Sequence, residues 1–326
     1  MRRCAMCWTL IALIASLVFV LSLPAQERSN KIRITYPAYS LAVLALFGGS
    51  QWKVFEENGL QVEILLARSQ IANAALASGE VGYVGGVGPA SVAATLSGMP
   101  SRAVWFASDQ LIYYLIARPE FRTLRELRNK KIGMTGLGGT SQVSLQIALE
   151  SAGENPKSFV YLGLAGGQLL SALESASIDA AMLSPPYSYF AKKKGFRELL
   201  DVGSGVKMPF GGLTTLVSTI ENRPDELKKV IRSLQLTKQE ILRAREKTVA
   251  LISSFLKVDR EAAEDTYVAY RKTVSGNGVP TPQGMENIVR SLHAADRFTD
   301  RKVAFEEIAD DRPAKEVARE LGYKIN

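Results

Sequence analysis

Short β-rich segments alternate with helical segments along the first part of the chain. The strand-like segments are 31–36 (KIRITY), 61–67 (QVEILLA), 81–87 (VGYVGGV), 101–107 and 110–117, and the helical ones are 41–58, 71–79 and 90–98. Strands that alternate with helices of this length are typical of parallel sheets with crossover helices. The pattern therefore predicts an α/β fold.

The same pattern then starts again. KIGMT (131–135) resembles KIRIT (31–35), and ALESASIDAAMLSPP (172–186) aligns with ALASGEVGYVGGVGP (75–89). The two matches occur in the same order, at offsets of 100 and 97 residues. This indicates a duplicated architecture with two α/β lobes, although any two β-α-β units share part of such a pattern.

The last third of the chain is mostly helical. The stretch 209–219 (PFGGLTTLVST) predicts another strand, and it is followed by Pro224 at a helix start and by Asp259 and Thr281 as plausible N-caps. This tail has no lobe-sized set of strands, so we expect it to pack on the first lobe.

That packing requires the chain to cross between the lobes twice, near 111–119 and near 206–216. The division predicted is a first lobe at 26–115, a second lobe at 116–208, and a return to the first lobe at 209–326. Two crossings would form a hinge.

The first 25 residues have the features of a secretory signal peptide. Arg2 and Arg3 precede an apolar run at 5–23, and a small residue, Ala25, follows Pro24. Cleavage near Ala25 predicts a periplasmic protein, whereas retention of the segment would give a membrane anchor.

Cysteine and histidine are scarce. Both cysteines, Cys4 and Cys7, lie in the predicted signal peptide, so the mature chain would have no disulfide, no thiolate nucleophile and no cysteine-based zinc site. The single histidine, His293, occupies a helical segment and is expected to be half-buried. We therefore predict no catalytic residue, no metal and no cofactor.

The charge of the chain does not indicate a nucleic-acid partner. The formal net charge is +8, of which Arg2 and Arg3 contribute two. The remaining basic residues are dispersed rather than gathered with aromatic residues, so we expect no nucleic-acid binding.

Ligands of parallel α/β sheets collect where the strands end and helices begin. The loops at these positions are 36–40, 85–91, 107–110, 136–141 and 184–189. The ligand-binding residues predicted in them are Tyr36, Tyr39, Ser40, Gly86, Gly88, Ser91, Asp109, Gly139, Thr140, Ser141, Ser184 and Tyr187. If the lobes face each other, these residues line one cleft.

The loop GLGGTS (136–141) is the most informative of these. It lacks the third glycine of a dinucleotide fingerprint and the lysine of a nucleotide P-loop. The free N–H groups of a helix start, together with Thr140 and Ser141, would suit a small anion or a polar head group. Ordinary N-capping by either hydroxyl is the alternative.

Other side chains do not decide the chemical class of the ligand. Asp109 could meet a cationic group, Tyr187 could point outward or into the core, and Asp179 at a strand start is expected to be structural. Sulfonate, nitrate, carboxylate and pyrimidine ligands all remain possible.

Several segments together resemble the nitrate/sulfonate/taurine-type substrate-binding proteins of ABC importers, a group that includes relatives binding thiamine-pyrimidine precursors. These segments are KIRITYPAY (31–39), ALASGEVGYVGGVGPAS (75–91), TLRELRNKKIGMTGLGGTS (123–141) and IDAAMLSPPYSYFAKKKGFREL (178–199). The resemblance spans about 31–321. One departure is Gly82, where family members often carry an acid.

The resemblance implies a type II periplasmic-binding fold that closes over one solute. A protein of this kind is a monomer that delivers its solute to an ABC permease, which is powered by a separate ATPase. Two other roles remain as alternatives: a membrane-tethered sensing module, if the first segment is not removed, and an enzyme on the same fold. The enzymes that resemble this scaffold either use a cysteine-rich stretch or are cytoplasmic, so we expect a binding protein.

Overall fold

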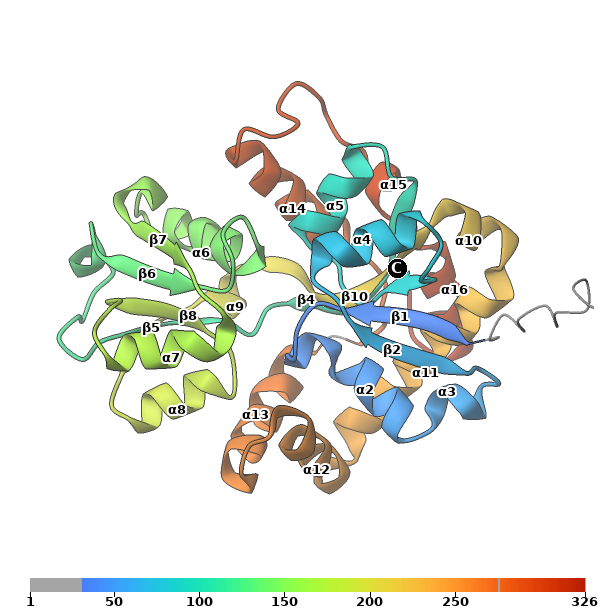
Figure 1. The fold of residues 1–326 in the computed structure, drawn as a ribbon, viewed down its shortest axis with the longest axis horizontal. Coiled ribbons are helices and arrows are strands. Elements are labelled where there is room, and N and C mark those ends of the chain that lie inside the picture. Colours follow the sequence, from blue (N-terminus) through green and yellow to red (C-terminus); the bar gives the residue numbers. More distant parts are fainter. Residues whose placement is uncertain (1–30, 275, 326) are drawn as a thin grey trace, which may run out of the picture. The chain divides into compact units, whose positions relative to one another are not determined.

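Two five-stranded sheets carry the fold (Figure 1). The computed structural model describes residues 31–274 and 276–325, so the predicted signal peptide lies outside the described residues. The first sheet has the order β2-β1-β3-β10-β4, with β1 (Ile32–Tyr36), β2 (Val62–Leu66), β3 (Tyr83–Val84), β4 (Ser101–Gln110) and β10 (Lys207–Leu216). The second has the order β7-β6-β8-β5-β9, with β5 (Tyr114–Ala117), β6 (Lys131–Met134), β7 (Val160–Gly163), β8 (Ala180–Leu183) and β9 (Arg197–Asp201).

The two sheets have equivalent topologies. In the first, β1 lies parallel between β2 and β3; in the second, β6 lies parallel between β7 and β8. An antiparallel strand then follows in each, β10 beside β3 and β5 beside β8. The strands predicted as repeats, at 31–35 and 131–135, therefore occupy the same place in the two sheets, which confirms the duplicated α/β architecture.

The helices of the first sheet lie on both of its faces (Figure 1). They are η1 (Leu41–Val43), α2 (Leu44–Gln51), α3 (Val54–Glu57), α4 (Ser69–Ala77) and α5 (Pro89–Leu96). Those that accompany the second sheet are η2 (Arg125–Leu127), α6 (Thr140–Ser151), η3 (Pro156–Ser158), α7 (Gly166–Glu174), α8 (Tyr187–Lys193) and α9 (Val202–Gly205).

Two predicted elements differ from the structure. The helix expected at 41–58 is broken between α2 and α3, because Lys53 adopts a left-handed backbone conformation with φ 59°. The strand expected at 81–87 pairs only at Tyr83 and Val84. It ends there because the backbone bends at Gly85, where a Cβ atom would lie 2.8 Å from the Thr35 carbonyl oxygen.

The chain changes sheet twice. It leaves the first sheet after β4 and enters the second at β5, and it returns between β9 and β10. The segment predicted as one strand at 110–117 is thus split at 111–113, and the predicted boundary at 115 falls inside β5. The sequence does not reveal where the chain leaves one sheet for the other, because apolar residues are buried both in the crossing at 111–113 and in β5.

The C-terminal helices pack mainly on the first sheet, as expected. They are α10 (Val217–Asn222), α11 (Pro224–Arg243), α12 (Arg245–Leu256), α13 (Arg260–Thr273), α14 (Pro282–Ala294), α15 (Phe305–Ile308) and α16 (Arg312–Glu320). Helix α11 contacts α2, and α14 contacts β10. The predicted N-caps are confirmed, since Asp259 accepts a hydrogen bond from the Ala262 N–H and Thr281 accepts one from the Gly284 N–H.

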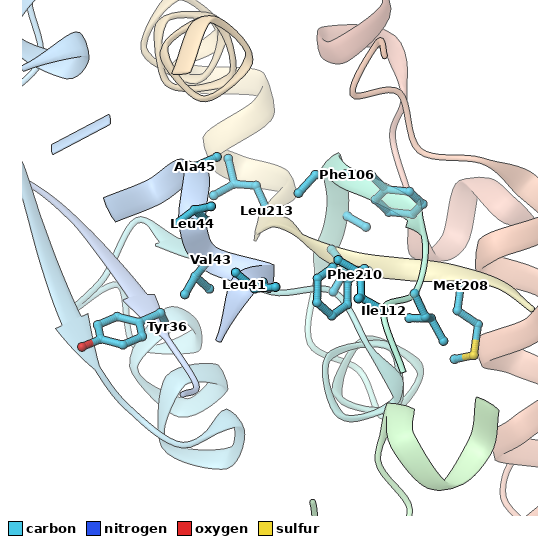
Figure 2. Close-up of a cluster of buried hydrophobic side chains, with 14 of the residues drawn as sticks. Tyr36, Leu41, Val43, Leu44, Ala45, Phe106, Ile112, Met208, Phe210 and Leu213 are labelled. Atoms are coloured by element: carbon cyan, nitrogen blue, oxygen red, sulfur yellow. The ribbon is translucent and has the colours of Figure 1, made fainter. Parts of the chain in front are cut away.

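The largest apolar core runs from β1 along the strands that lead to the crossings (Figure 2). Phe106 of β4 and Phe210 of β10 belong to it, together with Ile112 in the first crossing. The crossings are therefore embedded in packed side chains. His293 is half-buried in α14, as predicted.

Candidate functional site

Helix α6 begins directly after the glycine-rich loop and its N-terminus has no side-chain cap. Its N-cap residue is Gly139, and the first intrahelical bond runs from the Val143 N–H to the Gly139 carbonyl. The preceding N–H groups of the first turn therefore have no acceptor within the helix, and the helix dipole concentrates positive potential around them. This geometry suits an anionic group.

Two glycines of the loop have a backbone explanation, and Gly133, in the preceding strand β6, has a packing explanation. Gly136 and Gly138 adopt φ values of 81° and 72°, which side chains disfavour. A Cβ atom at Gly133 would lie 2.7 Å from Ile178 Cδ1. Only Gly139, with φ −88° and ψ 176°, is left as a glycine that the fold itself does not require.

The start of α5, on the first sheet, meets the start of α6, on the second. Gly88 is the N-cap of α5, and a Cβ atom at this residue would lie 3.3 Å from Thr140 Oγ1. Two predicted ligand residues from loops about 50 positions apart are thus neighbours. Both helix starts lack a capping side chain at the N-cap.

A third helix start lies beside α6. A Cβ atom at Gly166, in the first turn of α7, would lie 3.5 Å from Thr135 Cγ2, and one at Gly167 would lie 3.7 Å from the Tyr187 hydroxyl. Tyr187 is the first residue of α8 and follows Ser184 and the cis Pro185–Pro186 bond. The starts of α6 and α7 and the Tyr187 phenol therefore adjoin one another.

Two of the hydroxyls predicted to bind a ligand are instead engaged with other groups of the protein. The Ser91 hydroxyl is buried and accepts a hydrogen bond from the Gly88 N–H at 3.1 Å, so it serves the start of α5 itself. The Ser141 hydroxyl is also buried and lies 3.2 Å from Thr135 Oγ1. Of the two hydroxyls in GLGGTS, the half-buried one of Thr140 is the better placed for a ligand.

The β1–α2 loop contributes aromatic surface. Tyr39 is 59% exposed, and its ring lies 5.6 Å from that of buried Tyr36 and 5.5 Å from that of Phe255. Burial and the neighbouring Tyr39 raise the pKa of Tyr36 to about 12, so its phenol is neutral at physiological pH. Tyr36 belongs to the core, and Tyr39 is the accessible member of the pair.

The remaining predicted residues are placed as follows. Ser40 is the half-buried N-cap of η1, and the Gly86 carbonyl accepts a hydrogen bond from Thr214 Oγ1 at 2.9 Å. Asp109 faces Lys207, with 3.8 Å between Oδ2 and Nζ. A carboxylate that faces a lysine of its own chain is poorly suited to a cationic ligand. Asp179 accepts a hydrogen bond from the Lys131 N–H, which confirms its structural role.

Sequence reasoning missed Thr135 and the start of α7. Thr135 ends the repeated KIGMT segment, and the pair Gly166-Gly167 precedes a helical run, so both signals were present in the sequence. Among residues 31–274 and 276–325, no cluster of three or more histidine, cysteine or acidic residues could hold a metal ion. No helix in this same part of the chain is long and apolar enough to span a membrane.

The sequence profile of the NMT1/THI5-like family matches residues 52–243, more than half of the chain. The chain therefore belongs to this family. No curated protein sequence matches it significantly.

Solved structures with the same fold include several binding proteins. The ligand-binding component of an ABC-type import system from Staphylococcus aureus has a TM-score of 0.74 at 15% identity, covering 89% of this chain and 100% of its own. The alkanesulfonate-binding protein SsuA from Xanthomonas axonopodis pv. citri has 0.67 at 17%, covering 88% and 97%. The periplasmic nitrate-binding protein NrtA from Synechocystis PCC 6803 has 0.70 at 12%, covering 90% and 90%.

An enzyme shares the fold as well. The desulfurization enzyme DszB has a TM-score of 0.61 at 12% identity, covering 89% of this chain and 99% of its own. At these identities the likeness establishes the type II periplasmic-binding fold, and it leaves activity and ligand to be argued from the site.

Proposed function

We propose that this protein is the solute-binding component of an ABC importer and that it captures a small anionic organic solute between its two lobes. The observation that carries the proposal is the meeting of two helix starts whose N-cap residue is glycine, α5 at Gly88 and α6 at Gly139 and Thr140. Membership of the NMT1/THI5-like family and the import proteins among the structural neighbours support the same role.

Electrostatics favours an anion where these two helices begin. The N-terminal ends of two helices carry partial positive charge, so bringing them together without an anion is unfavourable. An anion between them accepts hydrogen bonds from both sides and offsets that repulsion. Because these helices belong to different sheets, such an anion binds best when the lobes are together, and binding shifts the population toward the closed state.

The residues proposed to contact the solute follow from this geometry. Gly139 and Thr140 would hold the anionic group, with Gly88 against Thr140 and Tyr187 beside the start of α7, while Tyr39 would face the remainder of the solute. Ser40, Gly86 and Ser184 would complete the loops around it. Ser91 and Ser141 would act by shaping the helix starts, because their hydroxyls are used within the fold.

Two substitutions at Thr140 test the donor role. Thr140→Ala removes the hydroxyl and should weaken solute binding about fivefold, the loss expected for one hydrogen bond. Thr140→Pro also removes the N–H, and we expect a loss of tenfold or more, as for a donor to a charged group. Proline is tolerated at the first position of a helix, and the extended backbone of Gly139 is compatible with a following proline.

Calorimetric titration of both variants, with thermal unfolding as the control, checks this. The transition temperatures should stay close to that of the wild type. Equal solute affinity in all three proteins would show that the start of α6 does not hold the solute.

Delivery to a permease and export to the periplasm belong to the same proposal. A tethered sensing module and an enzyme on this fold are the competing roles. Recovery of the solute unchanged after prolonged incubation separates binding from catalysis. Detection of residues 1–25 on the protein in membrane fractions would favour the sensor.

A further inference from the structure

Two ion pairs join helices of the second sheet to helices that pack on the first. Arg290 of α14 faces Glu150 of α6, with 2.9 Å between Nη2 and Oε2. Lys193 of α8 faces Glu261 of α13, with 2.7 Å between Nζ and Oε2, and these two helices are also in contact. Figure 1 shows α14 and α13 on opposite sides of β4 and β10. The two pairs therefore lie on opposite sides of the strands that lead to the crossings.

The pair of Arg290 and Glu150 lies beside the two helix starts of the candidate site. Helix α14 contacts α5, and Glu150 is the residue before the last in α6. The start of α5 meets the start of α6 where Gly88 adjoins Thr140. The ion pair thus joins the same two sides of the molecule as the helix starts do. Separation of the helix starts would also separate Arg290 from Glu150.

The pair of Lys193 and Glu261 lies beside the aromatic part of the candidate site. Helix α8 begins at Tyr187, and α13 contacts α12, whose Phe255 packs against the exposed ring of Tyr39 at 5.5 Å. Lys193 Nζ also donates a hydrogen bond to the Tyr189 hydroxyl of its own helix at 3.2 Å, which restrains the lysine side chain. Movement of α8 away from α13 would break the ion pair.

We infer that these two ion pairs form an interlobe latch, which favours the state with the lobes together and so raises the affinity for the solute. The four side chains are between 54% and 66% exposed, so the pairs contribute little to the stability of the fold. An equilibrium between two lobe arrangements responds to much smaller energies than unfolding does, and the apparent affinity scales with the competent fraction. The latch rests on the proposed function, in that it controls access to the proposed solute site.

Lys193→Glu tests the latch, with Lys192→Glu as a matched control. Lys192 is the preceding residue of α8 and pairs with Glu198 of β9 in the same lobe, at 3.2 Å. Both substitutions change the net charge equally, so a general effect on an anionic solute is the same in both. We expect Lys193→Glu to weaken solute binding about three- to fivefold relative to Lys192→Glu, because repulsion replaces the attraction of an exposed pair. Adding Glu261→Lys restores the pair in reverse and should return the affinity to within about twofold of the wild type.

The second pair should behave in the same way. We expect Arg290→Glu to weaken binding about three- to fivefold and Glu150→Lys to restore it, whereas Lys193→Glu and Arg290→Glu together should cost about tenfold or more, since separate sites add. In about 0.5 M salt, exposed charges are screened, so the affinities of these variants should approach that of the wild type. Equal losses in Lys193→Glu and Lys192→Glu, or no recovery in the exchanged pairs, would overturn the latch.

Small-angle X-ray scattering gives a measurement that needs no solute. At low salt, the variant with both Lys193→Glu and Arg290→Glu should have a larger radius of gyration than the wild type and Lys192→Glu, and the difference should shrink in about 0.5 M salt. An unchanged radius of gyration in the doubly reversed variant would contradict the latch. If the wild type binds no anion, the proposed function fails, and the scattering comparison alone still decides whether the two ion pairs hold the lobes together.

Discussion

Replacing Gly203 with alanine is expected to lower the free energy of unfolding by about 3 kcal/mol or more, at the upper end of overpacking costs. Gly203 lies in the second crossing, and a Cβ atom there would come 2.1 Å from the carbonyl oxygen of Leu111 in the first. The obstruction is backbone, so no side-chain rotation relieves it. The two crossings would have to separate, and the hydrogen bond from the Gly203 N–H to Tyr113 would be disturbed.

Gly205→Ala is the matched control, in the same short helix two residues further on. No atom lies within 4 Å of a Cβ placed at Gly205, so this change should be neutral or stabilising by up to about 1 kcal/mol. Denaturant unfolding of both variants gives the comparison. Equal stability of the two would mean that the crossings are not packed as described.

Lys238 is a lysine buried in the protein interior. It lies in α11 and is fully buried, with Nζ 3.3 Å from the Ala107 carbonyl oxygen and 5.5 Å from the Trp105 ring. Burial lowers the pKa of Lys238 to about 7, and the negative charge of Asp109 acts in the opposite direction. The lysine therefore costs stability whenever it must be protonated in the folded protein.

Lys238→Met should stabilise the protein at pH 7 by about 2 to 4 kcal/mol, because buried charges are often replaced favourably by apolar side chains. Between pH 7 and the ordinary lysine value of 10.5, the unfolded chain binds the extra proton and the folded one does not. Wild-type stability should then rise with pH across this window, and the advantage of the variant should shrink by an amount on the order of 4 kcal/mol.

The unfolding free energies of the wild type and of Lys238→Met, measured at several pH values, give the stability difference between them. The pH dependence that comes from other groups is common to both proteins and cancels in this difference. Lys229→Met, at an exposed position of the same helix, is the control and should give a difference that does not change with pH. If the difference in unfolding free energy between the wild type and Lys238→Met also stays constant with pH, burial does not lower the pKa of Lys238 in the folded protein.

The duplicated fold could be predicted because the two repeated sequence segments form strands that have equivalent neighbouring strands in their sheets. KIRIT and KIGMT lie in the same position of their sheets, and local hydrophobic patterning is sufficient to place them. The break at Lys53 and the short β3 could not be predicted, since they depend on a single backbone conformation and on the close approach of Gly85 to Thr35. Tertiary contacts decide both.

The candidate site was only partly predictable for a similar reason. Glycine-rich helix starts identify Gly88, Gly139 and Thr140 as candidates, but the sequence does not show which hydroxyls the fold itself uses. Ser91 and Ser141 look like Thr140 in the sequence, yet their partners are Gly88 and Thr135.

An anionic solute is proposed to bind where α5 and α6 begin. Calorimetric titration of the protein with sulfonates, nitrate, aromatic carboxylates and aminopyrimidines tests it most directly. We predict saturable one-to-one binding of one class of organic anion, unchanged after recovery, with added stability of about 2.7 kcal/mol at 100 times Kd, and weaker binding to Thr140→Pro. Binding confined to neutral or cationic compounds, or binding of no anion in the panel, would show that this protein is not an anion-binding protein.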